Sequence, residues 1–154
     1  MTKAEQKVDL ARCAEIAESC MNFRLRKLSR LVGAIYDEAL RPSGLRGTQF
    51  NVLVALALLR EVTVKRLAMT LAMDRTTLSR SLTPLERDGL VRSQPGADGR
   101  ERVLALTDLG HTRLKSAIAR WELAQARITE KLGRAKSQQL ATSLHAAANI
   151  FAKN

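Results

Sequence analysis

The chain has 154 residues, of which 45% are hydrophobic, and its formal net charge at pH 7 is +11. This hydrophobic content supports a packed core, which excludes a disordered chain, and the length fits one domain. The longest apolar run, residues 52–59, is far shorter than the roughly twenty residues that a transmembrane helix needs. The N-terminus lacks the apolar core of a signal peptide, so we expect a cytoplasmic protein with no membrane partner.

Charge and aromatic content together bear on the partner. A strongly basic chain favours an anionic partner. Aromatic residues make up only 3% of the chain and do not interleave with its basic segments. That scarcity argues against a binder of single-stranded nucleic acid that stacks bases on aromatic rings.

Residues 8–40 predict one long helix, because apolar side chains recur at helical spacing and Arg41-Pro42 ends the run. Cys13 and Cys20 both lie on it, and in a continuous helix their Cα atoms would be roughly 10 Å apart. A disulfide cannot span that distance, so a bond between them would need another subunit or local unwinding. Two interpretations stay open: small residues of a packing face, or thiols that respond to oxidants.

A second helix is predicted from Thr48, as its N-cap, to about Arg60. It follows the loop PSGLRG and contains the run FNVLVALALL. Because this run is apolar almost all round, we expect a central, buried helix.

Residues 64–107 then predict a short helix, a tight turn, a second helix and a hairpin with no spare residues between them. Asp74 is placed to cap the second helix of this segment, and Gly89 to end it. The apolar residues have the spacing that two steeply crossing helices need for a shared core: Leu67, Leu71, Met73, Leu78 and Leu82.

Short hydroxyl and long guanidinium side chains gather on the exposed N-terminal half of this second helix. Both kinds of group are suited to the edges of bases and to phosphates in double-stranded DNA. The candidate DNA contacts are Arg75, Thr76, Thr77, Ser79 and Arg80.

The hairpin, residues 91–107, has a turn rich in Gly and Pro, and arginines near its tip. A thin cationic loop is suited to a minor groove, so we add Arg100 and Arg102 to the candidate DNA contacts, with Asp98 as an ion-pair partner for a tip arginine. The whole order is that of a winged helix-turn-helix. The alternative is an ordinary amphipathic helix pair followed by a solvated loop.

Two further helices are predicted, over residues 107–132 and 134–152, separated by Gly133. Together with residues 8–40 they carry apolar faces that a compact DNA-binding lobe, residues 48–106, cannot cover alone. We therefore expect one mainly α domain, residues 1–154, with a small β-hairpin wing and a helical dimerisation region. A homodimer would place two reading helices about 34 Å apart on a pseudo-palindromic site. The alternative is a monomer with a self-contained bundle.

Two segments resemble the MarR (multiple antibiotic resistance regulator) family of bacterial transcription factors. One is DRTTLSRSLTPLERDGLV, residues 74–91; the other is DGRERVLALT, residues 98–107, with an Asp-x-Arg followed by a Leu-Thr pair. The resemblance implies a homodimeric regulator, repressor or activator, whose DNA affinity is altered by a small molecule or by oxidation. It also implies that Thr76, Thr77 and Arg80 approach bases and that Arg100 enters the minor groove.

Small-molecule control is the commoner mode in that family, and it implies a pocket where the dimer helices meet the DNA-binding lobe. The effector would be a small anionic or aromatic molecule, with Arg26 as the candidate partner for an anionic one. The expected lining is Phe23, Arg26, Leu28, Tyr36, Phe50, Leu114 and Trp121. The alternative mode, oxidation, would act through Cys20 or Cys13.

No catalytic constellation is apparent, and we expect neither an enzyme nor a cofactor nor a bound metal. His111 and His145 are isolated, with no cysteine or carboxylate at metal-ligand spacing. Besides a specific regulator, two classes stay open: a non-specific architectural DNA protein, and an enzyme or interaction module built on the same fold.

Overall fold

The computed structural model describes residues 8–96 and 101–152, and the chain divides into two units, residues 1–35 and 36–154. The first unit holds α1 (Leu10–Ser19) and most of α2 (Met21–Leu40). Asp9 caps α1, because its carboxylate accepts the backbone N–H groups of Ala11 and Arg12 at 2.9 and 3.3 Å.

The prediction of one continuous helix over residues 8–40 is wrong, since the helix is interrupted at Cys20. The backbone there is extended, with φ −68° and ψ 113°. The hydroxyl of Ser19 donates to the carbonyl of Glu15, a side-chain bond that bends helices. No residue of α1 is buried, so core packing among the described residues does not hold α1 in line with α2.

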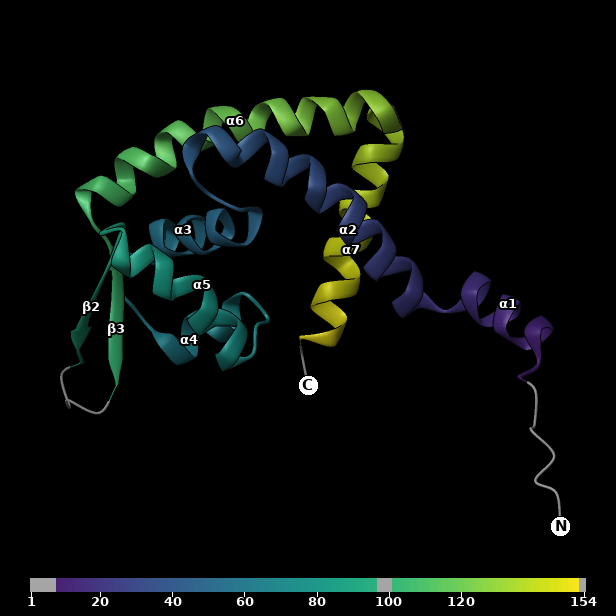
Figure 1. The fold of residues 1–154 in the computed structure, drawn as a ribbon, viewed down its shortest axis with the longest axis horizontal. Helices are drawn as coiled ribbons and strands as arrows, with labels where there is room; N and C mark the ends of the chain where they lie inside the picture. Colours follow the sequence, from purple (N-terminus) through teal and green to yellow (C-terminus); the bar gives the residue numbers. More distant parts are fainter. Residues whose placement is uncertain (1–7, 97–100, 153–154) are drawn as a thin grey trace, which may run out of the picture. The chain divides into compact units, whose positions relative to one another are not determined.

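The second unit contains the remaining elements, coloured from blue to yellow in Figure 1. In chain order they are η1 (Arg41–Ser43), α3 (Gly47–Leu59), β1 (Val62–Thr63), α4 (Val64–Thr70), α5 (Arg75–Arg87), β2 (Val91–Pro95), β3 (Arg102–Leu106), α6 (Asp108–Leu132) and α7 (Arg134–Phe151). This confirms a mainly α fold with a small β-hairpin wing.

The sheet has one strand more than the hairpin alone would give. Its order is β1-β3-β2, and both pairings are antiparallel. β1 pairs Val62 with Leu104 and Thr63 with Val103, which ties the start of α4 to the wing. The short β1 leaves no alternating pattern long enough for the sequence to reveal it.

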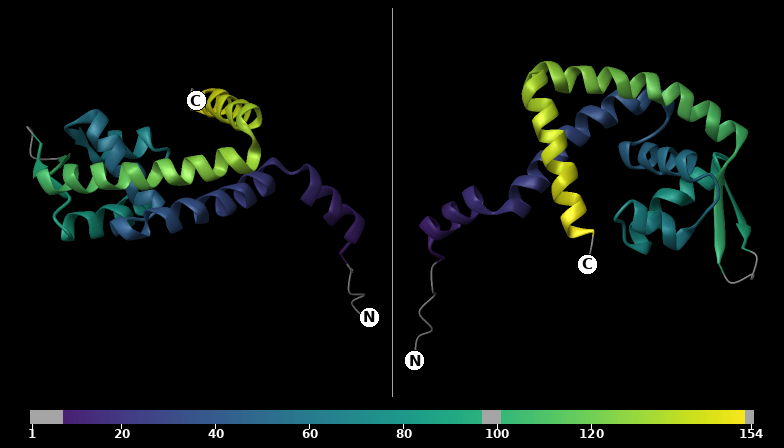
Figure 2. Two further views of the ribbon diagram at one scale, coloured as in Figure 1. Left: turned by 90° about the horizontal axis from the view of Figure 1, so that it is seen from above. Right: turned by 180° about the vertical axis from the view of Figure 1, so that it is seen from behind.

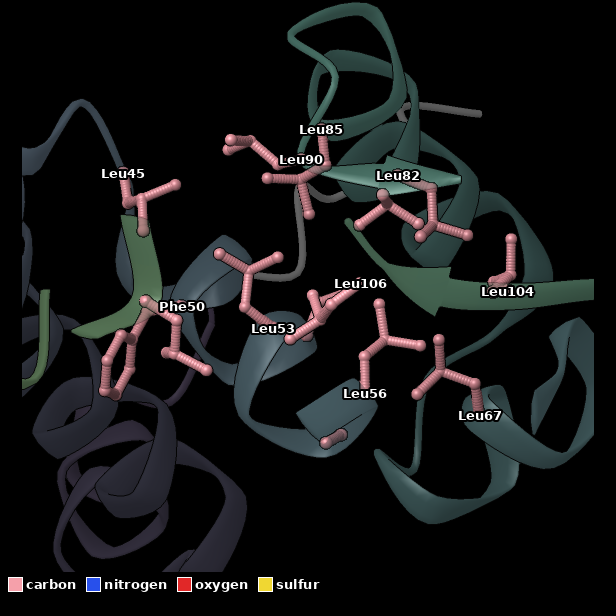
Figure 3. Close-up of a cluster of buried hydrophobic side chains, with 14 of the residues drawn as sticks. Leu45, Phe50, Leu53, Leu56, Leu67, Leu82, Leu85, Leu90, Leu104 and Leu106 are labelled. Carbon is pink, nitrogen blue, oxygen red and sulfur yellow. The ribbon is translucent and has the colours of Figure 1, made fainter. Parts of the chain in front are cut away.

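The core of this unit is built around α3, as its apolar sequence predicts. Val52, Leu53 and Leu56 are fully buried. Figure 3 shows Leu53 and Leu56 of α3 among leucines of α4, α5 and the wing, including Leu67, Leu82 and Leu106. Because α3 contacts α5, α6 and β3 at once, it fixes α5 and the wing to the long helix α6.

The predicted cap of α3 at Thr48 is wrong, because the helix begins two residues earlier. Arg46 is the N-cap, and its N–H donates to the side chain of Gln49 at 2.9 Å. Asp37, ten residues before the helix, accepts the N–H of Gly47 at 2.6 Å. This distant carboxylate supplies the cap that Thr48 would otherwise give.

The two C-terminal helices start and stop as predicted. Thr107 caps α6 by accepting the N–H of Gly110 at 3.0 Å, and Gly133 ends it with φ 78°. Figure 2 shows α6 running from the wing to its turn into α7. α6 buries Leu114 and Ile128, whereas α7 buries no residue within this chain.

Candidate nucleic-acid interface

Helices α4 and α5 meet across a four-residue turn, as the spacing of their apolar residues predicts. Leu67 of α4 and Leu78 of α5 are fully buried. Ala72 takes the turn with φ 49°, and the N–H of Met73 donates to the carbonyl of Ala68 at 2.9 Å. Alanine seldom adopts this left-handed conformation, so the turn carries some backbone strain.

Asp74 caps α5 through both of its carboxylate oxygens. One oxygen accepts the N–H of Thr77 at 2.8 Å, and the other accepts the hydroxyl of Thr77 at 2.6 Å. The hydroxyl and N–H of Thr77 hold the pKa of the Asp74 carboxyl below its usual range. The Asp74 cap is therefore confirmed, and the Thr77 hydrogen is committed to it.

The other candidate DNA contacts of α5 lie together on one surface. Arg75, Thr76, Ser79 and Arg80 are all exposed on the N-terminal half of the helix, opposite the buried Leu78 and Leu82. Within the described residues, neither Arg75 nor Arg80 forms an ion pair. Two guanidinium groups without ion-pair partners and two hydroxyls thus project from the first turns of a helix that Asp74 caps.

Two arginines of the wing strands, Arg92 and Arg102, form ion pairs with residues outside the hairpin while staying about half exposed. Arg102 donates from Nε to the hydroxyl of Ser93 at 2.8 Å and from Nη2 to Glu86 at 2.5 Å. On the other strand, Arg92 pairs with Glu61 at 3.1 Å. The candidate contacts Asp98 and Arg100 lie outside the described residues.

Gly110, which joins the interface to α6, is not among the residues that the sequence pattern singles out. A Cβ built on Gly110 would lie 2.1 Å from the carbonyl oxygen of Leu90, so only glycine fits. The hydroxyl of Thr107 also donates to the carbonyl of Gly89 at 2.6 Å. A glycine inside a helical pattern was the available signal, because glycine is a poor helix former kept for close approach.

The candidate effector residues divide between the two units. In the second unit, Phe50 and Leu114 are buried in the core, while Tyr36 and Trp121 pack half-buried against it. The hydroxyl of Tyr36 donates to Gln125, and burial raises the pKa of this phenol. Trp121 also lines a hollow of about 570 Å³ along α6 and the start of α7.

In the first unit, Phe23 and Arg26 are exposed and Leu28 is half-buried. Arg26 and Arg30 line a surface hollow of about 370 Å³ on α2. Cys13 is exposed, Cys20 is half-buried, and both thiols are free.

Residues 8–96 and 101–152 hold neither a metal-ligand group nor a membrane-spanning helix. No group of histidine, cysteine and acidic side chains there has the arrangement of a metal site. No helix in the same ranges has the length and apolar character needed to span a membrane.

Known proteins similar to this chain are transcriptional regulators. The sequence model of the MarR family matches residues 43–101. The transcriptional regulator MosR of M. tuberculosis, solved in complex with DNA, is 37% identical with a TM-score of 0.72, covering 86% of this chain and 98% of that one. CouR from Rhodococcus jostii RHA1, solved with p-coumaroyl-CoA, is 26% identical with a TM-score of 0.71, covering 85% and 93%.

Among curated proteins, the uncharacterized HTH-type transcriptional regulator YwoH of Bacillus subtilis (strain 168) is 31% identical over 84 residues. That alignment covers 54% of this chain and 61% of YwoH. The structural matches therefore extend over more of the chain than the curated one.

Proposed function

We propose, since this chain belongs to the MarR family of DNA-binding transcriptional regulators, that it is a homodimeric repressor that reads a pseudo-palindromic operator and releases it on binding a small effector. The observation that carries the proposal is the exposed N-terminal half of α5. Arg75, Thr76, Ser79 and Arg80 project there from a helix that Asp74 caps, beside a hairpin. Side chains of these types read base edges in the major groove and bind phosphates.

Operator binding can be tested with genomic DNA fragments selected on the purified protein. A specific regulator should bind its operator at least about a thousandfold more tightly than unrelated duplex at the same salt concentration. We expect Arg80→Ala to reduce this ratio by about tenfold to a hundredfold, because a guanidinium that reads a base discriminates by that much.

The matched control is Arg87→Ala, which removes the same charge from the opposite end of α5, where Arg87 pairs with Asp88. It should leave the ratio unchanged. Equal affinity of the wild type for all duplexes would contradict specific reading and favour an architectural DNA protein.

The homodimer is proposed from apolar side chains that the chain leaves uncovered. α1 and α7 bury no residue at all. Each unit leaves large apolar side chains in water: Leu10, Ile16, Met21 and Phe23 in the first, and Leu123, Leu144, Ile150 and Phe151 in the second. Pairing with a second copy would remove such surfaces from water, which is the usual driving force of obligate dimers.

An anionic or aromatic effector is proposed from the residues of α2 and of the second unit together with the relative CouR. Two arginines, Arg26 and Arg30, line one hollow on α2 and supply the charge that an anionic ligand needs. Trp121 offers an aromatic wall to the other hollow. Candidate aromatic acids and their thioesters should raise the thermal midpoint and lower operator affinity together. Arg26→Ala should weaken the response to anionic ligands, with Arg12→Ala on α1 as the charge control.

Redox control is a second candidate, favoured by two free thiols, of which Cys13 is exposed. Cys13 lies on α1 and Cys20 is the C-cap of that helix, with its N–H donating to the carbonyl of Ile16 at 2.9 Å, so the helical spacing that forbids a bond between them within one chain still applies. Mild peroxide should then lower operator affinity and leave a modified thiol visible by mass spectrometry. Thiols that stay unmodified while peroxide has no effect on binding would leave Cys13 and Cys20 as packing residues.

A further inference from the structure

We infer that Arg102, Glu86 and Ser93 form a clasp that holds the wing in a fixed position against α5, and that Arg102 is a positioning residue rather than a DNA contact. This wing clasp rests on the proposed function, since its purpose is to let helix and wing engage one duplex together. It assigns a different role to a residue that sequence reasoning placed on DNA.

The register of the hairpin shows why Arg102 points at the lobe. β3 pairs with β2 so that Arg102 lies opposite Pro95, Leu104 opposite Ser93 and Leu106 opposite Val91. Because side chains alternate along a strand, Arg102 shares a face with the buried Leu104 and Leu106. Its guanidinium therefore extends the core-facing side of the sheet at the end nearest the wing tip.

Glu86 comes to meet it from the inner side of α5. It lies four residues after Leu82 and next to Leu85, both of which are buried, and 27% of its side chain is exposed. A carboxylate in such a position loses part of its hydration and needs a partner. Arg102 is that partner at 2.5 Å, and its Nε is held at the same time by Ser93.

The charge of Glu86 argues for positioning as well. A carboxylate close to a DNA-binding surface repels phosphates, so it should weaken binding unless it does something else. Here it neutralises Arg102 and joins β3 to the helix. The other described arginine of the hairpin strands, Arg92, is likewise paired with a glutamate outside the hairpin, Glu61, in the connection between α3 and β1.

A rigid joint is what simultaneous binding requires. The helix reads one groove and the wing binds beside it, so the angle between them must match the duplex before contact. A wing free to swing would lose orientational entropy on binding, and affinity would fall without the loss of any direct contact. The wing clasp would remove that cost in advance.

The test measures operator affinity and its salt dependence for Glu86→Gln and for its control Asp88→Asn. Asp88 is the C-cap of the same helix and forms an ion pair with its neighbour Arg87. If charge alone mattered, both variants would bind DNA more tightly. The clasp predicts that Glu86→Gln instead binds about threefold to fivefold more weakly, the range of a half-exposed ion pair, while Asp88→Asn does not weaken binding.

Arg102→Gln separates positioning from phosphate contact. A lost phosphate contact reduces the slope of log affinity against log salt by about 0.9, whereas a lost clasp lowers affinity with the slope unchanged. The double variant Glu86→Gln/Arg102→Gln should bind no more weakly than either single variant, because both remove one joint. Ser93→Ala keeps every charge and should weaken binding slightly at the same slope, so it tests the clasp even where a charge variant folds poorly.

Two outcomes would overturn the clasp: a reduced salt slope for Arg102→Gln, or tighter binding by Glu86→Gln. Neither would touch the proposed function. Specific reading of DNA fails on a different result, a wild-type chain that shows no preference for any duplex.

Discussion

At the scale of single residues, one carboxylate sets the start of the helix proposed to read DNA. Asp74 satisfies the N–H of Thr77 and takes its hydroxyl hydrogen as well. The cap depends only on residues three positions apart, so the pattern Asp-x-x-Thr is enough to predict it. The same bonds lower the pKa of Asp74, which makes the cap sensitive to acid.

We expect Asp74→Ala to lower the thermal midpoint at pH 7 by about 2–4 °C, as the loss of a helix cap does in a chain of this size. Since the folded pKa of Asp74 lies below its unfolded value, the cap stabilises fully above the unfolded pKa, about 3.9, and this advantage is lost as pH falls through the folded pKa. The gap between wild type and variant in calorimetry should therefore shrink from pH 7 to pH 3. Asp88→Ala, at the other end of the helix, is the control and should lower the midpoint less, because it removes only an exposed ion pair with Arg87 and no helix cap of the first turn. A gap that widens in acid would contradict the assignment.

Ala72 is the residue at which this chain departs from the glycine common in such turns. Its φ of 49° lies in the left-handed region, where an L side chain costs about 1–2 kcal/mol. Glycine removes this cost but loses about 0.4–1 kcal/mol through the entropy of the unfolded chain. Ala72→Gly should therefore raise the free energy of unfolding by about 0.5–1 kcal/mol.

Urea denaturation would measure this gain. Ala68→Gly is the matched control, because Ala68 lies inside α4 and glycine should cost about 1 kcal/mol there. A variant at position 72 that is less stable than the wild type would show that the turn is not strained.

At the scale of elements, a helix end is predicted correctly where it depends on the residue at that position and wrongly where it depends on residues elsewhere in the chain. Gly133 stops α6 because a positive φ is needed at its own position. The prediction of Thr48 as the cap of α3 is wrong because the carboxylate of Asp37, outside the helix, accepts the N–H of Gly47. The interruption at Cys20 was missed for a related reason, since apolar spacing cannot tell whether a face is covered.

The candidate site shows the same division between local and distant signals. The exposed side chains of α5 follow from helical periodicity and one cap. The pairing of Arg102 with Glu86 does not, because it joins residues sixteen positions apart through the register of a hairpin. The sequence alone therefore predicts which residues are exposed on α5, but it does not predict which arginines of the wing form ion pairs within the protein.

The junction of α6 with the wing provides the element-scale prediction. Gly110 lets the first turn of α6 lie against the carbonyl of Leu90, at the end of the α5–β2 connection. A methyl group at this position must push the backbone apart, so Gly110→Ala should lower the free energy of unfolding by about 2–3 kcal/mol.

The control for this substitution is Gly33→Ala in α2, where a Cβ would meet nothing within 4 Å. It should raise helix stability by about 0.5–1 kcal/mol instead. Equal effects of the two substitutions in urea denaturation would mean that the close approach to Leu90 does not constrain α6.

At the scale of the whole molecule, the uncovered helices make oligomeric state the decisive property. The side chain of Phe151 at the end of α7 is 80% exposed, and Ile150 beside it is 69% exposed. Exposed apolar residues are ordinary when scattered, but α7 contacts α6 without burying any of its own residues, so its own chain stabilises it little. The proposed dimer would cover these residues.

We expect sedimentation equilibrium of the wild-type chain to give twice the 17.0 kDa of one chain at micromolar concentration. Ile150→Glu/Phe151→Glu should shift it toward 17.0 kDa, because burying two carboxylates in an apolar interface costs several kcal/mol. Leu58→Glu is the matched control, since Leu58 is also 80% exposed but lies on α3, outside the proposed dimerisation helices. This variant should stay dimeric. The double variant should also bind the operator more weakly, because separate chains no longer hold two α5 helices one turn of DNA apart. A wild type that sediments as a single chain yet binds its operator would place the reading unit in one copy and remove the need for symmetry.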